Sequence, residues 1–326
     1  MKHVPDLVYY PDHHPGITRR RAGRGWSYIA PCGNRIRDPD ERDRLNRLAV
    51  PPAYTDVWIC PRPDGHLQAT GRDAKGRKQY RYHESWTAFR ARRKYADLPS
   101  FGTYLPAIRR RIRRDLRNDA GDRDFAVAAV LAMIDRLSLR VGHSKDVDHG
   151  AYGATTLRPR HVTLDDESLR LDYRGKGGAR ITKTLRDKRL AKVLHRLDDL
   201  PGATFVTWID AHGRVHEVTS TLVNELLHDI TGEHGYTAKT FRTWNGTVAA
   251  LEIALREEKL TVKTLAEAAA EALGNTPTIA RNSYIHPAVI DLVDTPLAQR
   301  QRLAEDPPGP RELRIPEKAL LSLLAG

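Results

Sequence analysis

The sequence has few cysteines and no long apolar run, and both absences exclude classes of protein. Cys32 and Cys60 are the only cysteines among 326 residues. Two are too few for a disulfide scaffold or a four-cysteine zinc site, and they suit a reduced compartment, with a single disulfide left open. No stretch of 18 apolar residues is present, which excludes a transmembrane helix. The opening MKHVPDLVYYPDHHPG lacks the apolar centre of a signal peptide, so we expect a cytoplasmic protein.

Metal and nucleotide motifs are also missing. Two loose groups of histidine and aspartate occur, one at 12–14 and one at 143–149, and neither has the ligand spacing of a zinc site. The glycine-rich run at 175–178 is not followed by the Lys-Ser/Thr of a phosphate-binding loop. We therefore expect no required metal and no ATP binding.

Positive charge is abundant and unevenly distributed. The formal net charge is +13. Residues 1–117 hold 26 Lys+Arg against 12 Asp+Glu, whereas residues 118–326 hold 28 against 29. The whole excess therefore lies in the first third of the chain. Such a block indicates a polyanionic partner, most often nucleic acid, although a solvated arginine-rich surface would give the same count.

Residues 1–90 are predicted to form a small β-rich domain. Short runs of β-branched and aromatic residues alternate there with Gly/Pro turns, which is typical of antiparallel hairpins. A short helix is expected at 38–50, because Asp38 can cap it and Pro39 suits its first position. The expected strands are 17–21, 25–29, 54–59, 66–70 and 79–83.

Residues 91–326 are predicted to form a mainly helical domain that contains a small antiparallel sheet. An interruption at 98–102 is expected to separate two basic helices, and alternating residues predict strands within 155–185 on either side of a turn at 174–178. The predicted fold class is therefore α+β. The helical pattern begins at about residue 86, before this boundary. The expected helices are 86–95, 104–116, 126–139, 187–198, 219–231, 240–255, 261–273 and 317–324, and the expected strands are 155–157, 161–164, 169–173 and 179–183.

A few polar residues of the second domain stand out by their order rather than individually. Each has an ordinary explanation: Tyr284 as a half-buried tyrosine at a helix end, Arg140 as a cation at a helix C-terminus, Lys176 as a turn lysine and Arg242 as a surface cation. Their order along the chain is Arg140, Lys176 on a glycine-flanked turn, Lys239-Thr-Phe-Arg242, Asn275, and Tyr284 nine residues after that asparagine.

This ordered set resembles the type IB DNA topoisomerases, in particular the small viral and bacterial members. The resemblance extends from Pro11 to about Asp291. It includes three stretches of the β-rich domain, at 55–59, 65–73 and 76–83. Each motif alone is weak, whereas the complete set in this order is highly specific.

The resemblance implies a role for each residue. Tyr284 would attack the scissile phosphate and form a 3′-phosphotyrosyl bond, and Lys176 would protonate the departing 5′-hydroxyl. Arg140 and Arg242 would hold the non-bridging oxygens, which suits a planar fork of donors. Asn275 stands where many members have histidine; its amide can donate one hydrogen bond but carries no charge.

Family members also imply how DNA is held, with the β-rich domain and the catalytic domain closing as a clamp around the duplex. Tyr80 and Tyr82 share one face of their strand and match an aromatic strand that members place in a DNA groove, although a half-buried sheet face would look the same. The basic helix at 109–114 would follow phosphates. The expected DNA-binding residues are Arg77, Lys78, Gln79, Tyr80, Tyr82, Arg109, Arg110, Arg113 and Lys239.

The resemblance therefore implies a monomeric isomerase whose partner is double-stranded DNA, associated with the nucleoid and not with a membrane. Relaxation of positive and negative supercoils would need neither ATP nor a metal, with Mg²⁺ at most a stimulant of DNA release.

Two alternatives remain at this point. A tyrosine recombinase or integrase shares the Arg, Lys, Arg, Tyr chemistry, but it usually has His-x-x-Arg where this chain has Lys239-Thr-Phe-Arg242, and it usually carries a helical N-terminal domain. A non-enzymatic DNA-binding protein with the same fold would bind DNA without cutting it.

Overall fold

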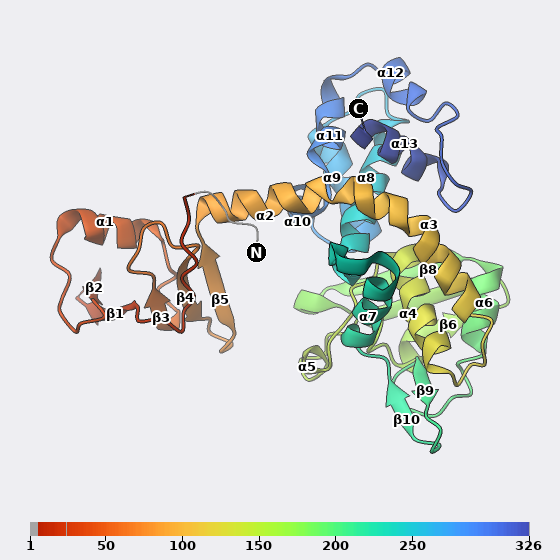
Figure 1. The fold of residues 1–326 in the computed structure, drawn as a ribbon, viewed down its shortest axis with the longest axis horizontal. Coiled ribbons are helices and arrows are strands. Elements are labelled where there is room, and N and C mark those ends of the chain that lie inside the picture. Colours follow the sequence, from red (N-terminus) through yellow and green to blue (C-terminus); the bar gives the residue numbers. More distant parts are fainter. Residues whose placement is uncertain (1–5, 24, 326) are drawn as a thin grey trace. The chain divides into compact units, whose positions relative to one another are not determined.

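The computed structural model describes residues 6–23 and 25–325, in two compact units (Figure 1). The first unit runs through Ala96 and the second begins at Asp97. The boundary expected after residue 90 falls inside helix α2 (Glu84–Ala96), which belongs to the first unit. Within the described ranges, no helix has both the length and the apolar character needed to cross a bilayer.

The N-terminal unit contains a five-stranded antiparallel sheet with the strand order β2-β1-β3-β4-β5. All five expected strands are confirmed, and each observed end lies within two residues of the expected one. Helix α1 (Pro39–Arg47) begins as predicted, with the Asp38 carboxylate accepting from the Glu41 N–H at 3.0 Å. The strands are β1 (Ile17–Ala22), β2 (Gly25–Ile29), β3 (Thr55–Ile59), β4 (Leu67–Arg72) and β5 (Lys78–Tyr82).

A small apolar core holds this unit together. Ile17, Val57 and Ile59 from the sheet pack with Leu45 from α1. Strand β5 forms one of the two edges of the sheet, and its Tyr80 and Tyr82 are exposed. Since side chains two apart share a face, the edge presents both rings on one side.

The second unit is mainly helical and contains two small antiparallel sheets. Its helices are α3 (Leu98–Asp115), α4 (Arg123–Leu137), α5 (Ser144–Val147), α6 (Lys188–His195), α7 (Ser220–Thr231), α8 (Ala238–Ala254), α9 (Val262–Leu273), α10 (Pro277–Tyr284), α11 (Pro287–Ile290), α12 (Leu297–Arg302) and α13 (Ile315–Ala325). Its strands are β6 (Val162–Leu164), β7 (Ser168–Arg174), β8 (Arg180–Arg186), β9 (Thr207–Ile209) and β10 (Val215–Glu217). Short 3₁₀ turns lie at 159–161, 176–178, 232–234 and 291–294.

The structure differs from the prediction for this unit in several places, and the short helices α5, α10, α11 and α12 were not predicted. Residues 155–157 are not a strand, since 154–156 form a turn, and the sheet begins only at β6. The β9–β10 hairpin was not predicted, because its strands are only three residues each. Helix α3 starts at Leu98 rather than Tyr104: proline is tolerated in a first helical turn, and Gly102 is required by packing, since a Cβ there would lie 2.4 Å from the Trp244 ring.

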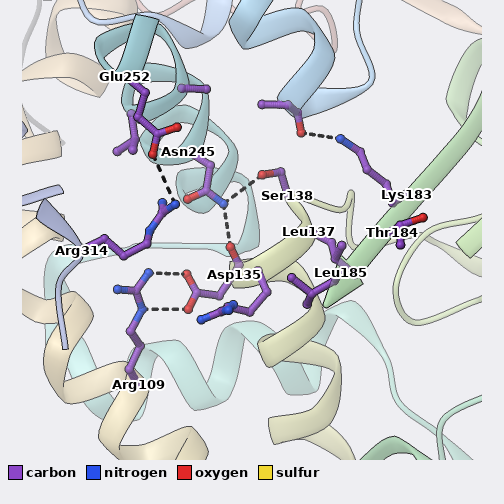
Figure 2. A pocket seen from close by; sticks show the side chains of 14 residues that line it. Arg109, Asp135, Leu137, Ser138, Lys183, Thr184, Leu185, Asn245, Glu252 and Arg314 are labelled. Atoms are coloured by element: carbon purple, nitrogen blue, oxygen red, sulfur yellow. Dashed lines mark hydrogen bonds and ion pairs between the residues drawn. The ribbon is translucent and has the colours of Figure 1, made fainter. Parts of the chain in front are cut away.

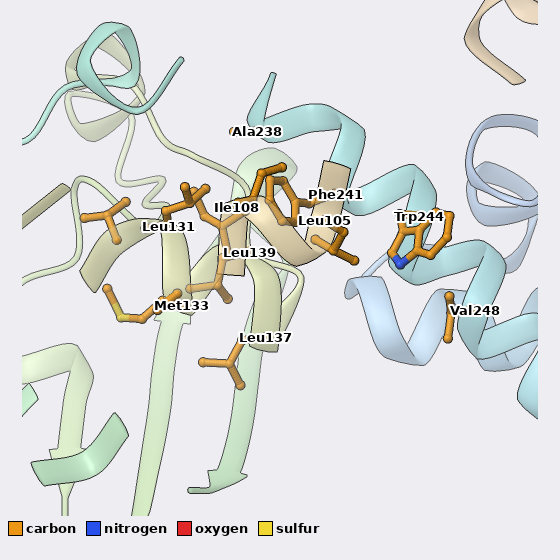
Figure 3. Close-up of a cluster of buried hydrophobic side chains, with 14 of the residues drawn as sticks. Leu105, Ile108, Leu131, Met133, Leu137, Leu139, Ala238, Phe241, Trp244 and Val248 are labelled. Atoms are coloured by element: carbon orange, nitrogen blue, oxygen red, sulfur yellow. The ribbon is translucent and has the colours of Figure 1, made fainter. Parts of the chain in front are cut away.

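The core of the second unit forms where α3, α4 and α8 meet (Figure 3). Helix α4 is buried on nearly all its faces, as expected of a helix without a polar side. Leu105 and Ile108 of α3 gather with Leu131 and Met133 of α4 and with Phe241 of α8. This core fixes the end of α4 against α8, where the residues of the candidate site are found.

A buried ion network ties the C-terminal helix to this core. The Arg109 guanidinium donates to Asp135 at 2.9 and 3.0 Å and to Glu317 of α13 at 2.8 Å to each oxygen. Glu317 is fully buried and also accepts from the Trp244 indole and the Arg314 backbone N–H. Arg109 was predicted to contact DNA phosphate; its charge is instead enclosed by two carboxylates of the same unit.

Stability should therefore depend on Glu317. Burial raises the pKa of this carboxyl, but hydrogen bonds and the charge of Arg109 outweigh it and lower the pKa to about 2 from 4.5. Because the folded-state pKa is the lower one, the stabilisation is complete above pH 4.5 and is lost as the pH falls towards 2. Glu317→Gln should lower the free energy of unfolding by about 3 kcal/mol at neutral pH in urea titrations, with the difference from wild type shrinking below pH 4.5.

Glu267→Gln is the matched control, since Glu267 forms only an exposed surface pair with Lys263. An equal loss of stability in both variants at neutral pH would contradict a stabilising role for the buried network.

Candidate active site

One pocket of about 300 Å³ in the second unit collects most of the predicted catalytic residues. Four of the five line it, although they come from distant parts of the chain: Arg140, Lys176, Arg242 and Tyr284. Lys239, predicted as a DNA contact, lines the same pocket. Four cationic side chains and one tyrosine therefore line the same pocket, which is a site suited to a phosphate.

The backbone that carries Arg140 is pinned directly after α4. The Arg140 carbonyl accepts from the Ala154 N–H, and the Val141 carbonyl accepts from the Thr155 N–H, both at 2.8 Å. The two segments approach so closely that a Cβ on Gly153 would lie 2.6 Å from the Arg140 carbonyl oxygen. The half-buried Arg140 side chain thus starts from a fixed backbone.

Lys176 lies on the turn that connects β7 and β8. Gly177 and Gly178 have φ values of 81° and 82°, which side-chain-bearing residues rarely adopt. The Gly175 N–H donates to the Ala179 carbonyl at 2.7 Å and closes the turn. The turn is exposed, so the lysine side chain extends from a tight backbone at the surface.

Arg242 of α8 is the most buried residue of the predicted set, with 4% of its surface exposed. Its guanidinium donates to the carbonyls of Ser138 and Leu273, the residues at the C-terminal ends of α4 and α9. Helix C-termini favour cations, which offsets part of the cost of burial. Burial and the charge of Arg140 lower the pKa of Arg242, whereas Tyr284 raises it. The group stays protonated, because arginine is not deprotonated in proteins.

Asn275 lies directly beside Arg140. Gly274 ends α9 in a left-handed conformation, and the Asn275 N–H then donates to the Ala270 carbonyl at 3.0 Å. Its Oδ1 accepts from Arg140 Nη2 at 2.5 Å. Because arginine has only donors, the amide atom that faces Arg140 must be the acceptor Oδ1, and the second amide atom is therefore the donor Nδ2. Nδ2 is buried and has no hydrogen-bond partner among the residues that the structure describes.

Tyr284 is the last residue of α10 and packs against α8. The fully buried Thr247 holds its backbone, with Oγ1 donating to the Tyr284 carbonyl at 3.0 Å and accepting from the His286 N–H at 3.1 Å. The Arg242 guanidinium carbon lies 5.3 Å from the centre of the Tyr284 ring. Helix α8 therefore positions both the tyrosine and the buried arginine.

The predicted DNA-binding residues of the N-terminal unit lie on and next to β5. Tyr80 and Tyr82 are 53% and 43% exposed, and their rings stack with centroids 6.2 Å apart. Lys78 pairs with Asp12 at 2.5 Å, and Arg77 pairs with Asp73 at 2.7 Å, so both cations are partly neutralised. The Gln79 amide also donates to Asp73.

The remaining basic residues of α3 lie on its surface. Arg110 and Arg113 are about half exposed, and both approach Glu312, at 3.7 and 3.0 Å. Their side chains are much more exposed than that of the enclosed Arg109. Among the described residues, no group of three or more His, Cys, Asp or Glu side chains is arranged to hold a metal ion.

Sequence reasoning missed the residues that position the site. Gly246, Thr247 and Ser138 touch Tyr284 or Arg242 over long stretches of chain. Their only sequence signal is closeness to a predicted catalytic residue: two follow Arg242 by one helical turn, and Ser138 precedes Arg140 by two residues.

Two family models match the chain. The model described as the bacterial DNA topoisomerase IB N-terminal domain matches residues 25–73. The model described as the eukaryotic DNA topoisomerase I catalytic core matches residues 83–285, which is more than half of the chain and ends one residue after Tyr284.

Curated relatives agree with these models. "DNA topoisomerase 1B" of Acanthamoeba polyphaga mimivirus is 27% identical over 303 residues, covering 87% of this chain and 89% of the relative. "DNA topoisomerase 1B" of vaccinia virus (strain Copenhagen) is 22% identical, covering 76% and 81%. A solved structure of the XerH site-specific recombinase bound to difH substrate is 15% identical over 55% of this chain and 47% of that one, and its TM-score of 0.36 is too low to carry an argument.

The contact between α8 and Tyr284 should make Gly246 intolerant of a side chain. A Cβ at this position would lie 2.8 Å from Leu273 Cδ1 and 3.1 Å from both Cβ and the carbonyl oxygen of Tyr284. Gly246→Ala should therefore lower the free energy of unfolding by about 1–2 kcal/mol, although the same change in an open helix would raise it.

Gly121→Ala is the matched control, because a Cβ there would meet only Ile209 Cδ1, at 4.0 Å. Urea titrations should show it neutral or slightly stabilising. A stabilising Gly246→Ala would show that α8 and the tyrosine do not pack in this way.

Proposed function

The chain belongs to the type IB DNA topoisomerases, and from that premise we propose that it relaxes supercoiled duplex DNA through a transient 3′-phosphotyrosyl bond to Tyr284. The observation that carries this proposal is the pocket that brings Arg140, Lys176, Arg242 and Tyr284 together from four separate segments. The catalytic-core match also disfavours a recombinase.

The proposed reaction exchanges one phosphodiester for another. The Tyr284 oxygen forms a bond to phosphorus, the bond from phosphorus to the 5′ oxygen breaks, and the tyrosine proton is released. The ester can then be attacked by the free 5′-hydroxyl, because a phenolate is a good leaving group. Bond energy is conserved, so torque in the DNA alone drives relaxation of either supercoil sign without ATP.

Charge stabilisation in this scheme falls to the arginines. Arg242 is fixed by two carbonyls before substrate binds, so little reorganisation is needed when charge builds up on the phosphoryl oxygens. Asn275 binds Arg140 through Oδ1 and keeps Nδ2 without a partner among the described residues, so the amide group can donate to a non-bridging oxygen. This supports the asparagine as a neutral substitute for the histidine of other members.

Proton transfer falls to Lys176. The 5′ oxygen leaves as a strong base and needs a proton. The ammonium group of a lysine on an exposed turn can donate that proton and can then be reprotonated by solvent. No step requires a metal, so Mg²⁺ would at most speed DNA release. We also infer that the enzyme works as a monomer on cytoplasmic, nucleoid-associated DNA.

Plasmid relaxation in EDTA without ATP tests the proposed activity. The wild-type enzyme should relax positively and negatively supercoiled plasmid, whereas Tyr284→Phe should bind DNA near-normally and relax none. Tyr104→Phe is the control for loss of a hydroxyl in the same unit. Residual relaxation by Tyr284→Phe would exclude it as the nucleophile, and an inactive wild type would overturn the proposed function.

A modified substrate tests Lys176 as the general acid. Lys176→Ala should slow cleavage of ordinary DNA at least 100-fold, within the usual range for acid catalysis. A 5′-bridging phosphorothiolate should restore the rate, because a thiolate leaves without protonation. Lys188→Ala, which removes an exposed lysine beside Glu167, should cleave both substrates normally. Failure of the sulfur substrate to rescue Lys176→Ala would exclude the assignment.

A further inference from the structure

Ser138 joins the end of α4 to the site. Its carbonyl accepts from Arg242, and Arg140 follows two residues later. Its backbone is left-handed, with φ 57° and ψ 32°, although it carries a side chain and is buried. Glycine adopts this conformation at lower cost and is the usual residue where a helix ends this way. A serine here suggests that the hydroxyl has a use.

That hydroxyl is bound by Asn245 of α8 (Figure 2). Asn245 Nδ2 donates to Ser138 Oγ at 3.1 Å and to the Asp135 carbonyl at 2.9 Å. The Asp135 carbonyl belongs to the last turn of α4, whose carbonyls lack partners within the helix. Because that carbonyl can only accept, the amide nitrogen must face it, and the orientation of the side chain is fixed.

Asn245 and Arg242 are three residues apart, so they lie on the same face of α8. Helix α8 thus contacts the end of α4 at three points: the Asp135 carbonyl, the Ser138 hydroxyl and the Ser138 carbonyl. Two of these three contacts are made by the uncharged amide of Asn245, a residue that is only 7% exposed. Together these bonds set where the guanidinium of Arg242 lies and where the chain turns towards Arg140.

We propose that Asn245 and Ser138 are positioning residues for strand cleavage, which hold Arg242 and Arg140 at fixed positions around one phosphate. This inference rests on the proposed function. Neither residue needs to touch DNA. Loss of the pair should loosen both arginines while the apolar core between α4 and α8 keeps the unit folded.

Two variants test the pair. Asn245→Ala removes the amide, and the space opens onto a second pocket of about 310 Å³ that Asn245 and Ser138 both line, so water can enter. Ser138→Gly removes the hydroxyl while relieving the left-handed backbone, so it should fold even if the first variant does not. Thr231→Ala is the matched control: Thr231 is equally buried and bonds a helix carbonyl, but it does not line the site.

Single-turnover cleavage of a duplex substrate should be about 10- to 100-fold slower for Asn245→Ala, and several-fold slower for Ser138→Gly, than for wild type. DNA affinity and melting temperature should change no more than in Thr231→Ala. A cleavage rate equal to the control, or a loss explained by weaker DNA binding or a smaller folded fraction, would overturn the proposal.

A substrate with an uncharged group in place of the scissile phosphate separates the positioning role from a general loosening of the fold. The quantity compared is the loss of cleavage rate on that substrate. A methylphosphonate at the scissile position removes a charged oxygen, so wild type should lose the help of its arginines on that substrate. Asn245→Ala has already lost part of this help and should show a correspondingly smaller penalty. An equal penalty in both enzymes would exclude the positioning role, whereas a wild type that fails to cleave the ordinary phosphodiester would instead overturn the proposed function.

Discussion

A buried guanidinium held only by neutral oxygens is the constraint on which the catalytic unit depends. No salt bridge to Arg242 is found in residues 6–23 and 25–325, and its charge is offset by carbonyls at the ends of α4 and α9. A cation that is buried without a counter-ion is costly, so these carbonyl contacts are needed to keep Arg242 in place. The same two helix ends also lead the chain to Arg140 and Asn275, so fold and site share one junction.

The elements and the ordered motif could be predicted from local sequence, whereas the supports of the site could not. Periodicity and turn residues located α4, α8 and the β7–β8 turn with Lys176, and the order of polar residues located the set that the pocket brings together. Thr247 holds Tyr284 across 37 residues and Asn245 holds Ser138 across 107, and no local pattern marks such contacts. Gly102 was predicted to interrupt a helix, because the Trp244 ring that requires a glycine there lies far away in sequence.

Net charge overstates the phosphate-binding surface of this protein. In the basic run of α3, Arg109 is enclosed by Asp135 and Glu317, and Arg111 pairs with the buried Asp115 at 2.6 Å. Arg110 and Arg113 remain on the surface. The basic run is therefore divided: Arg109 stabilises the junction with α13, Arg111 pairs within its own helix, and Arg110 and Arg113 are about half exposed.

Covalent attachment of Tyr284 to DNA inside this arginine-lined pocket is the step on which the proposed function depends. Its most direct test is to trap the covalent complex on a duplex whose cleaved strand end diffuses away, digest protein and DNA, and identify the modified peptide by mass spectrometry. The expected product carries a nucleotide on Tyr284 through its 3′-phosphate. Attachment to any other residue, or through a 5′-phosphate, would contradict it.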